Sequence, residues 1–269
     1  MMFKVDDLDE TRAPLLDHLI ELRTRIVRAL LALGVGFAVC LYFADEILGI
    51  LVQPLKDAFP EGQGQLIFTK LPEVFFVELK VALFAGFMVS FPVIANQLWA
   101  FVAPGLYARE KKAFLPFLFA TPVLFSAGAA LAYFVVMPVA FTFFLGFGGT
   151  TGGLNVQALP SAGDYLSLVM QFILAFGLTF LLPVLLLLLH RAGIVSRAQM
   201  VAARRYVIVV IFVIAAIVTP PDPGSQIVLA VPLWLLFEAS LLLMRFQEKA
   251  VAADKAAREA EASAGAAAE

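Results

Sequence analysis

Apolar residues run through this chain in long blocks that short polar connections separate. Six stretches are long or nearly long enough to cross a bilayer as helices, at roughly 26–44, 76–98, 113–139, 165–190, 205–219 and 226–244. The fifth offers only about 14 apolar residues, or ~21 Å of helix against a hydrocarbon core of ~30 Å. The pattern predicts an all-α polytopic membrane protein with six transmembrane helices.

Prolines recur within or near these stretches, at Pro92, Pro116, Pro122, Pro138, Pro183 and Pro232. A proline inside a helix removes a backbone hydrogen bond and kinks the helix. A short span must also thin the bilayer or lean on its neighbours. We therefore expect kinked helices in a curved, cup-like bundle.

The two ends of the chain differ from this pattern. Residues 14–25 place leucines on one side of a helix and Asp17, Glu21 and Arg25 on another, with Glu21 and Arg25 at favourable i,i+4 spacing. We expect an amphipathic helix there, lying along the membrane interface before the first span. Residues 246–269 are a low-complexity run of Ala, Glu, Lys and Arg, typical of a marginal helix or disorder. Residues 1–245 are thus predicted to form a single membrane domain.

Three connections carry turn residues. The two longest, 45–75 and 145–164, contain several glycines and prolines, and "TPPDPGSQ" at 219–226 forms a tight turn between the last two spans. On these grounds Pro54 is a candidate turn-forming proline and Asp222 a candidate helix cap.

Composition and charge fix the class and the orientation. The chain is 62% hydrophobic and 15% charged, with a mean hydropathy of +0.93. Its hydrophobic content is well above the roughly 45–50% of soluble domains. Lys and Arg are concentrated in the N-terminal arm, after the second and fourth stretches, and in the tail. The connections between these segments hold few or none. By the positive-inside rule, both termini are expected in the cytoplasm.

The residues disfavour an enzyme and a small-solute transporter. His18 and His190 have no Cys or acidic neighbours at ligand spacing, and HExxH and GxSxG motifs are absent, so no catalytic or metal site is predicted. The middles of the first, third and fourth spans hold no charge that could serve as a coupling site.

The inner face carries two noticeable carboxylates, Glu21 and Glu110. Glu110 stands among Arg109, Lys111 and Lys112 at the predicted start of the third span. There it can simply complement the helix dipole. An interfacial carboxylate is equally suited to bind a guanidinium group through two hydrogen bonds. The residues alone leave both interpretations open.

Four blocks carry a resemblance to a known family. "HLIELRTRI" at 18–26, "FPVIANQLWAFVAPGLYAREKK" at 91–112, "DYLSLVMQFILAFGLTF" at 164–180 and "VTPPDPGSQ" at 218–226 together resemble the TatC family of twin-arginine translocases. The resemblance implies a six-helix receptor of the bacterial inner membrane. Such receptors bind the paired arginines of signal peptides on folded cargo and work with the single-span proteins TatA and TatB, driven by the proton-motive force.

The resemblance also implies roles for particular residues. Glu110 and Glu21 would form the signal-binding patch, with Phe101 in the same patch and Arg23 in the N-terminal block. Pro54 and Asp222 match outer positions that matter in the family.

Leu181 stands where the family usually has Glu or Gln, a polar residue that helps to seat a partner helix. The partner contact on the fourth span is therefore expected to be apolar, which leaves Thr219 and Gln226 either as polar anchors for TatA or TatB or as caps of the turn.

We further expect contacts with other copies of the chain and with membrane lipids, and neither a cofactor nor nucleic acid. The competing hypotheses are a multi-span solute transporter and an intramembrane enzyme or assembly scaffold.

Overall fold

The computed structural model describes residues 6–59, 64–106, 115–151, 154–156, 158–191, 193–218 and 223–266. These residues are almost entirely helical. The helices are α1 (Asp6–Tyr42), α2 (Ala44–Ala58), α3 (Glu73–Leu106), α4 (Leu115–Leu131), the π-helical turn η2 (Ala132–Val136), α5 (Met137–Leu145), α6 (Ala162–Thr179), α7 (Leu182–Arg191), α8 (Arg197–Ala202), α9 (Arg204–Val218) and α10 (Pro223–Ala266). Two short strands, β1 (Gly149–Thr151) and β2 (Leu154–Val156), pair antiparallel with Thr150 opposite Asn155.

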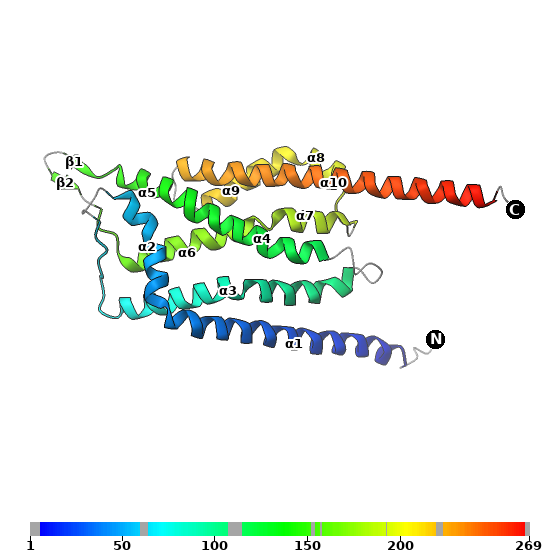
Figure 1. Cartoon of the computed structure of the whole chain (residues 1–269), viewed down its shortest axis with the longest axis horizontal. Coiled ribbons are helices and arrows are strands. Elements are labelled where there is room, and N and C mark those ends of the chain that lie inside the picture. Colours follow the sequence, from blue (N-terminus) through cyan, green and yellow to red (C-terminus); the bar gives the residue numbers. More distant parts are fainter. Residues whose placement is uncertain are drawn as a thin grey trace.

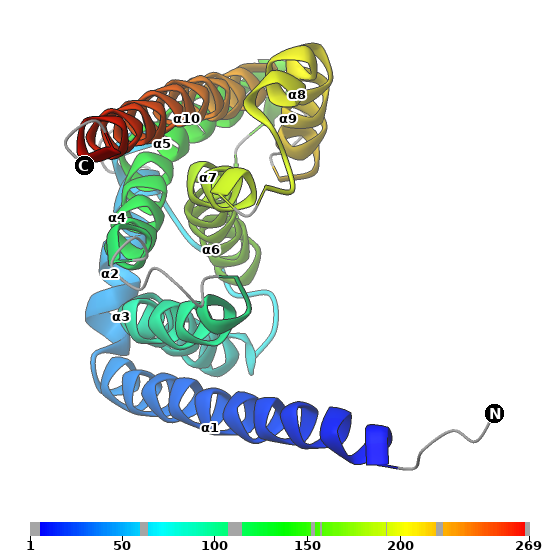
Figure 2. The same cartoon turned by 90° about the vertical axis from the view of Figure 1, so that its right-hand side faces the viewer.

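The long helices run side by side between two ends of the molecule (Figure 1). We call the end with α2 and the β1–β2 pair the hairpin end, and the end from which both chain termini project the termini end. Seen along the helices, α1, α3, α6–α7 and α9 follow a curve, so the bundle is bowed (Figure 2).

Five helical stretches within the described residues are long and apolar enough to cross a membrane. They are His18–Tyr42, Glu73–Phe101, Phe117–Leu145, Ala162–Arg191 and Gln226–Lys249. The fifth predicted span corresponds to α9, which has 15 residues and is shorter than these five.

The structure differs from the sequence prediction at three places. The amphipathic segment 14–25 and the first span are not separate helices, because α1 continues unbroken from Asp6 to Tyr42. Pro54 lies inside α2 and is buried there, so it does not form a turn. In the connection 145–164, β1 and β2 form a hairpin that the turn residues alone did not predict. Of the two alternatives for the tail, the structure has the helix, because α10 continues to Ala266.

Small residues bring α1 against α3. A Cβ atom added to Gly36 would lie 2.5 Å from Ser90 Oγ and 2.8 Å from the carbonyl oxygen of Gly86, and one added to Gly86 would lie 2.6 Å from Phe37 N. The Ser90 hydroxyl donates to the carbonyl of Ala32 at 2.8 Å. Small residues of this kind let two membrane helices approach at backbone distance. At this crossing α1 and α3 lie at backbone distance and run antiparallel (Figure 1).

Pro54 has a specific structural consequence in α2. A helical proline lacks the N–H that would bond to the carbonyl four residues earlier, here that of Ile50. The hydroxyl of Tyr133 donates to the Ile50 carbonyl at 2.6 Å, and the hydroxyl of Tyr165 donates to the next carbonyl, Leu51, at 2.7 Å. Two tyrosines from other helices therefore hold α2 at the point where its own ladder is interrupted.

Glu73, the first residue of α3, joins two connections at the hairpin end. Its Oε1 accepts hydrogen bonds from Ser161 Oγ at 2.7 Å and Gly163 N at 2.8 Å. Its Oε2 accepts from the backbone N and hydroxyl of Thr69, at 2.7 and 2.9 Å, and from Lys70 N at 3.2 Å. We call these five residues the Glu73 cluster. Because every partner donates, the cluster favours the ionised carboxylate.

Candidate functional site

The α1–α3 pair positions the residues predicted to bind a signal peptide. Because α1 and α3 run antiparallel from their crossing, the start of the α1 span meets the end of the α3 span. There the rings of His18 and Phe101 stack, with centroids 4.4 Å apart and planes 20° from parallel. Glu21 follows His18 by about one helical turn. The structure thus places Glu21 and Phe101, which are far apart in sequence, on neighbouring parts of two packed helices.

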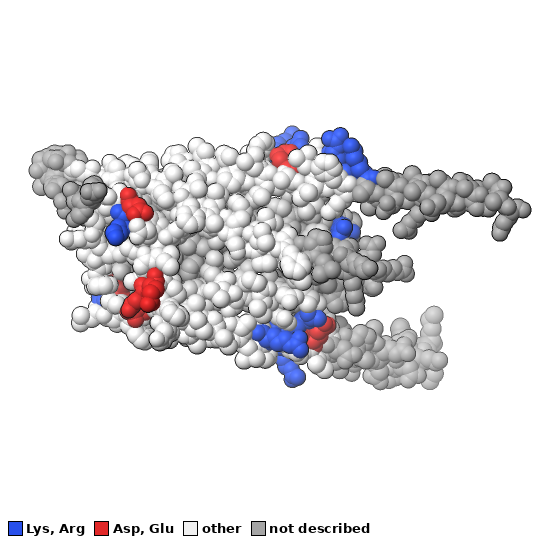
Figure 3. Space-filling view, in the orientation of Figure 1, with Lys and Arg blue, Asp and Glu red and all other residues white. Residues whose placement is uncertain are grey.

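The charges of this face are only partly satisfied. Glu21 forms an ion pair with Arg25, four residues later on the same helix, as the spacing predicts. Both oxygens of a carboxylate accept hydrogen bonds, so Glu21 keeps capacity for a second donor. Arg23 is exposed to solvent. In Figure 3 most of the Lys and Arg side chains on the visible face lie toward the termini end.

Three of the predicted site residues are not placed. Glu110, Thr219 and Asp222 lie outside the described residues. The proposed grouping of Glu110 with Glu21 therefore stays a prediction, as does the anchoring role of Thr219.

Leu181 is half-buried and lines an apolar groove of about 410 Å³. Leu178 and Leu185 also line this groove, together with Phe91 and Leu98 of α3. The groove also contains Thr121, whose hydroxyl accepts from Trp99 Nε1 at 2.7 Å and donates to Phe117 O at 2.8 Å, so its polar atom is engaged. The surroundings of Leu181 are thus apolar, and the partner contact there stays a prediction.

Gln226 lies in the first turn of α10, half-buried, and forms no hydrogen bond with any described residue. Its amide carries two donors and an acceptor. The side chain is therefore available to a partner helix.

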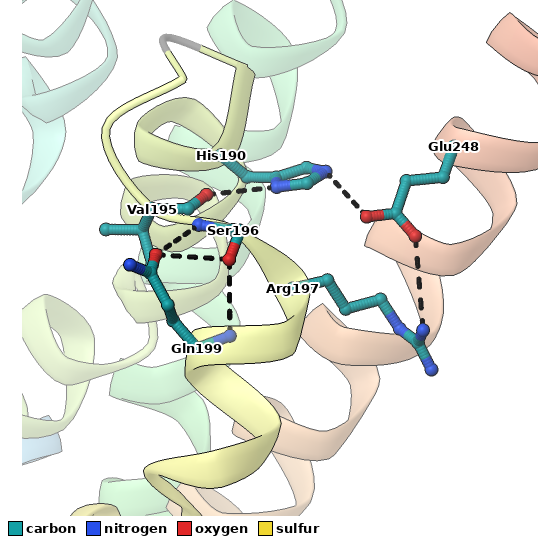
Figure 4. A network of polar contacts seen from close by, with 6 residues as sticks. All are labelled: His190, Val195, Ser196, Arg197, Gln199 and Glu248. Carbon is teal, nitrogen blue, oxygen red and sulfur yellow. Dashed lines mark hydrogen bonds and ion pairs between the residues drawn. The ribbon is translucent and has the colours of Figure 1, made fainter.

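A polar network at the termini end was not recognised in the sequence (Figure 4). His190 Nδ1 lies 3.1 Å from Val195 O, and its Nε2 lies 3.6 Å from Glu248 Oε1. Arg197 Nη1 lies 3.9 Å from the other oxygen of Glu248. The capping box of Ser196 and Gln199 starts α8 beside them, and its S-x-x-Q spacing is visible in the sequence. The network ties α10 to α7 and α8.

The fold and this face define a multi-pass α-helical membrane protein with a carboxylate, paired only with Arg25 among the described residues, one helical turn from a stacked pair of rings at one end. The family model described as "Sec-independent protein translocase protein (TatC)" matches residues 17–232. Under that name, a protein of Magnetococcus marinus is 49% identical over 252 residues, which cover 94% of this chain and 91% of that protein. One from Escherichia coli K12 is 38% identical over 237 residues, covering 88% and 90%.

A solved structure agrees with these relatives. The crystal structure of a "Twin Arginine Translocase Receptor- TatC" superimposes with a TM-score of 0.71 at 39% identity, covering 85% of this chain and 98% of that one. The chain therefore belongs to the TatC family. It is a component of the Sec-independent protein translocase, with a role in transport rather than catalysis.

Proposed function

We propose that this chain is the signal-peptide receptor of its translocase. The termini end binds the paired arginines of a twin-arginine signal peptide on a folded precursor. The observation that carries the proposal is the juxtaposition of Glu21 and the His18–Phe101 stack on α1 and α3. A carboxylate with an open oxygen can bind a guanidinium group, and an aromatic ring favours its planar face. The superimposed crystal structure is that of a twin-arginine translocase receptor, which supports the same role.

Glu110 is the second acid of this proposed patch, and Arg23 borders it. The acid of the 91–112 block would reach the signal peptide from the connection between α3 and α4, while Glu21 approaches from α1. Since Arg25 already pairs with Glu21, Glu110 is proposed to make the stronger contact with the incoming arginine.

We propose six spans in the bacterial inner membrane, with both termini in the cytoplasm and the hairpin end outside. Lys and Arg of the described residues support this orientation, because Arg23, Arg191, Arg197 and Arg245 lie on segments near the termini end. The remaining crossing, fifth in chain order, is made by α9. Its 15 residues span ~22 Å, less than a typical core of ~30 Å, so the bilayer thins around it or its neighbours cover its ends.

Residues 1–245 form the proposed membrane domain, and 246–269 extend from it as a cytoplasmic tail. Single-span proteins of the TatA and TatB type and other copies of this chain are the proposed partners, with the proton-motive force driving transport. Leu181 offers partners an apolar wall, while Thr219 and Gln226 are the proposed polar anchors. Pro54, which lies inside α2, and Asp222 are the further residues proposed to matter on the outer side.

Signal-peptide crosslinking tests the proposal. Membranes containing this chain are incubated with a photoreactive twin-arginine signal peptide or with its twin-lysine variant. We expect crosslinks to the termini end with the arginine peptide and a marked loss with the lysine peptide, because lysine lacks the planar fork that binds a carboxylate through two bonds. Equal crosslinking by both peptides would exclude a twin-arginine receptor and favour a general scaffold. A solute transporter predicts no crosslink with either peptide.

A further inference from the structure

A polar groove at the hairpin end lies apart from the proposed signal-binding face. It encloses about 510 Å³ between the first turns of α3 and α6. Its charged lining consists of Lys70, Glu73, Lys80 and Asp164, and Ser167 adds a hydroxyl. Neither the signal-peptide patch nor the partner contacts account for these groups.

The two lysines of the groove lack ionic partners. Neither Lys70 nor Lys80 forms an ion pair with any described carboxylate. Lys80 is exposed and lies seven residues after Glu73, or ~10 Å along α3 from its start. A lysine at such a depth in a membrane-spanning helix requires a counter-charge or must reach back to the interface. A ligand phosphate would supply the missing charge.

The two acids of the groove differ in their availability. Both oxygens of Glu73 are occupied by the five donors of its cluster. The Asp164 carboxylate is exposed and makes no hydrogen bond or ion pair with a described residue. Ser167 lies one turn further along the same face of α6; its hydroxyl donates to Gly163 O at 2.7 Å and so keeps lone pairs for an incoming donor. Asp164 and Ser167 can therefore accept hydrogen bonds from an ammonium group.

The formal charges in the lining of the groove sum to zero, since it contains two lysines and two acids. A ligand with a phosphate and an ammonium group matches this pattern better than one with a net negative charge. A quaternary ammonium lacks the N–H groups that Asp164 and Ser167 would accept. The complement is a phosphoethanolamine group.

An apolar groove lies further along the same face of α3. At 100° per residue, Phe91, Ile94 and Leu98 lie within about 40° of Lys80 around the helix axis. These three residues line the apolar groove of about 410 Å³. Lys80 and Phe91 are ~16 Å apart along the helix. A molecule with a polar head at Lys80 and a long apolar chain would follow this face.

We propose that this groove binds a phospholipid with an ethanolamine headgroup from the leaflet at the hairpin end. The phosphate lies against Lys70 and Lys80, the ammonium donates to Asp164 and Ser167, and one acyl chain runs along α3 toward Phe91. This site goes beyond the receptor function and does not depend on it.

Native mass spectrometry of the full-length chain tests the site. The detergent-purified protein is titrated with phosphatidylethanolamine, phosphatidylcholine or phosphatidylglycerol of identical acyl chains. We expect the ethanolamine lipid to be retained best. Lys80→Gln should weaken it at least ~10-fold, because a hydrogen-bonded charge contact is lost, whereas Lys80→Arg should retain it. Asp164→Asn should remove the preference over the choline lipid. The matched control is Lys56→Gln, an exposed lysine of α2 outside the groove, which should change nothing.

Three results would overturn the proposal. The first is equal retention by Lys80→Gln and the unchanged chain. The second is tighter binding of phosphatidylglycerol than of phosphatidylethanolamine, which would indicate an ordinary anionic-lipid contact. The third is displacement by soluble phosphoethanolamine at concentrations equal to the lipid, which would make the ligand a free headgroup. Should Lys80→Gln misfold, judged by gel filtration, Asp164→Asn and Lys80→Arg decide the outcome.

Discussion

Two glutamates of this chain, Glu73 and Glu21, show opposite uses of a carboxylate. Glu73 accepts five hydrogen bonds from residues of two separate connections. Glu21 has one ionic partner among the described residues, Arg25 of its own helix. The two carboxylates have the same chemistry. Other residues of the chain occupy the hydrogen-bond acceptors of Glu73 fully, but those of Glu21 only in part.

The contrast separates a structural acid from a candidate binding acid. A carboxylate saturated by backbone and hydroxyl donors fixes the segments that provide them, and offers nothing to a ligand without breaking the fold. A carboxylate with one flexible partner can exchange that partner for an incoming guanidinium group. We therefore regard the Glu73 cluster at the hairpin end as a fixed cap, and the termini end as the proposed receiving surface.

The largest expected effect concerns the receiving surface. Glu110→Gln should abolish export of twin-arginine cargo, because truncating one partner of a desolvated charge pair costs ~2–5 kcal/mol, or ~30-fold or more in affinity. Glu21→Gln should reduce export less, since Arg25 already neutralises Glu21. Export assays and precursor crosslinking measure both, with membrane insertion checked by immunoblot. Normal precursor binding by the Glu110 variant would contradict the assignment.

Glu73→Ala should affect the fixed cap instead. Removing the shared acceptor leaves the donors of Thr69, Ser161 and Gly163 without it, so the thermal unfolding midpoint in detergent should fall. Glu46→Ala, an exposed acid in the first turn of α2, is the matched control and should stay close to the unchanged chain. If both variants unfold at the same temperature, the Glu73 cluster contributes no stability.

Partner contacts should have an intermediate effect. Gln226→Leu should weaken crosslinking to a TatA- or TatB-type partner, since an interhelical hydrogen bond in a membrane contributes ~0.6–2 kcal/mol. Leu181→Gln should be tolerated. The reverse result, in which Leu181→Ala alone uncouples the partners, would place the main contact on the fourth span.

A double-mutant cycle examines how α2 is held. Tyr133→Phe should destabilise the protein by ~1 kcal/mol, because the Ile50 carbonyl loses its donor. In a Pro54→Ala background the restored helical N–H of residue 54 can serve that carbonyl, so Tyr133→Phe should cost little. Denaturant unfolding of the four proteins gives the coupling. Equal costs in both backgrounds would show that proline and tyrosine act independently.

The smallest effect is expected in the tail. Deleting residues 249–269 keeps Glu248 and its contacts with His190 and Arg197. The removed segment has no apolar face to bury, so export should stay near normal. Loss of export at unchanged protein level would show that the tail docks a partner.

The sequence predicted what the bilayer imposes and missed what long-range contacts decide. Apolar blocks are obligatory in a membrane, so most helices lie where the pattern placed them. Pro54 indicated a turn because a proline interrupts the backbone hydrogen bonds of a helix. The local sequence does not show that the hydroxyls of Tyr133 and Tyr165 donate to carbonyls of α2 and so support the helix there. The break expected before the first span is absent, since no proline follows Pro14 in α1 and the helix continues from the amphipathic segment into the span.

The candidate site was predictable to the same degree. The pair of Glu21 and Arg25 follows from i,i+4 spacing and is present. The stack of His18 on Phe101 joins two helices, and no local pattern indicates it. The Glu73 cluster was missed altogether, because its donors Thr69 and Ser161 come together only when two connections fold against each other.

The glycine contact between α1 and α3 has a mechanical consequence. Gly36 and Gly86 touch at backbone distance, and α1 continues from there toward Glu21 for 15 residues, or ~22 Å. A tilt of ~5° about that contact would carry the Glu21 carboxylate by ~2 Å, enough to make or break a hydrogen bond of the length that proteins use. Because Gly36 and Gly86 have no side chains, α1 lies so close to α3 that the position of Glu21 depends on the angle of this crossing.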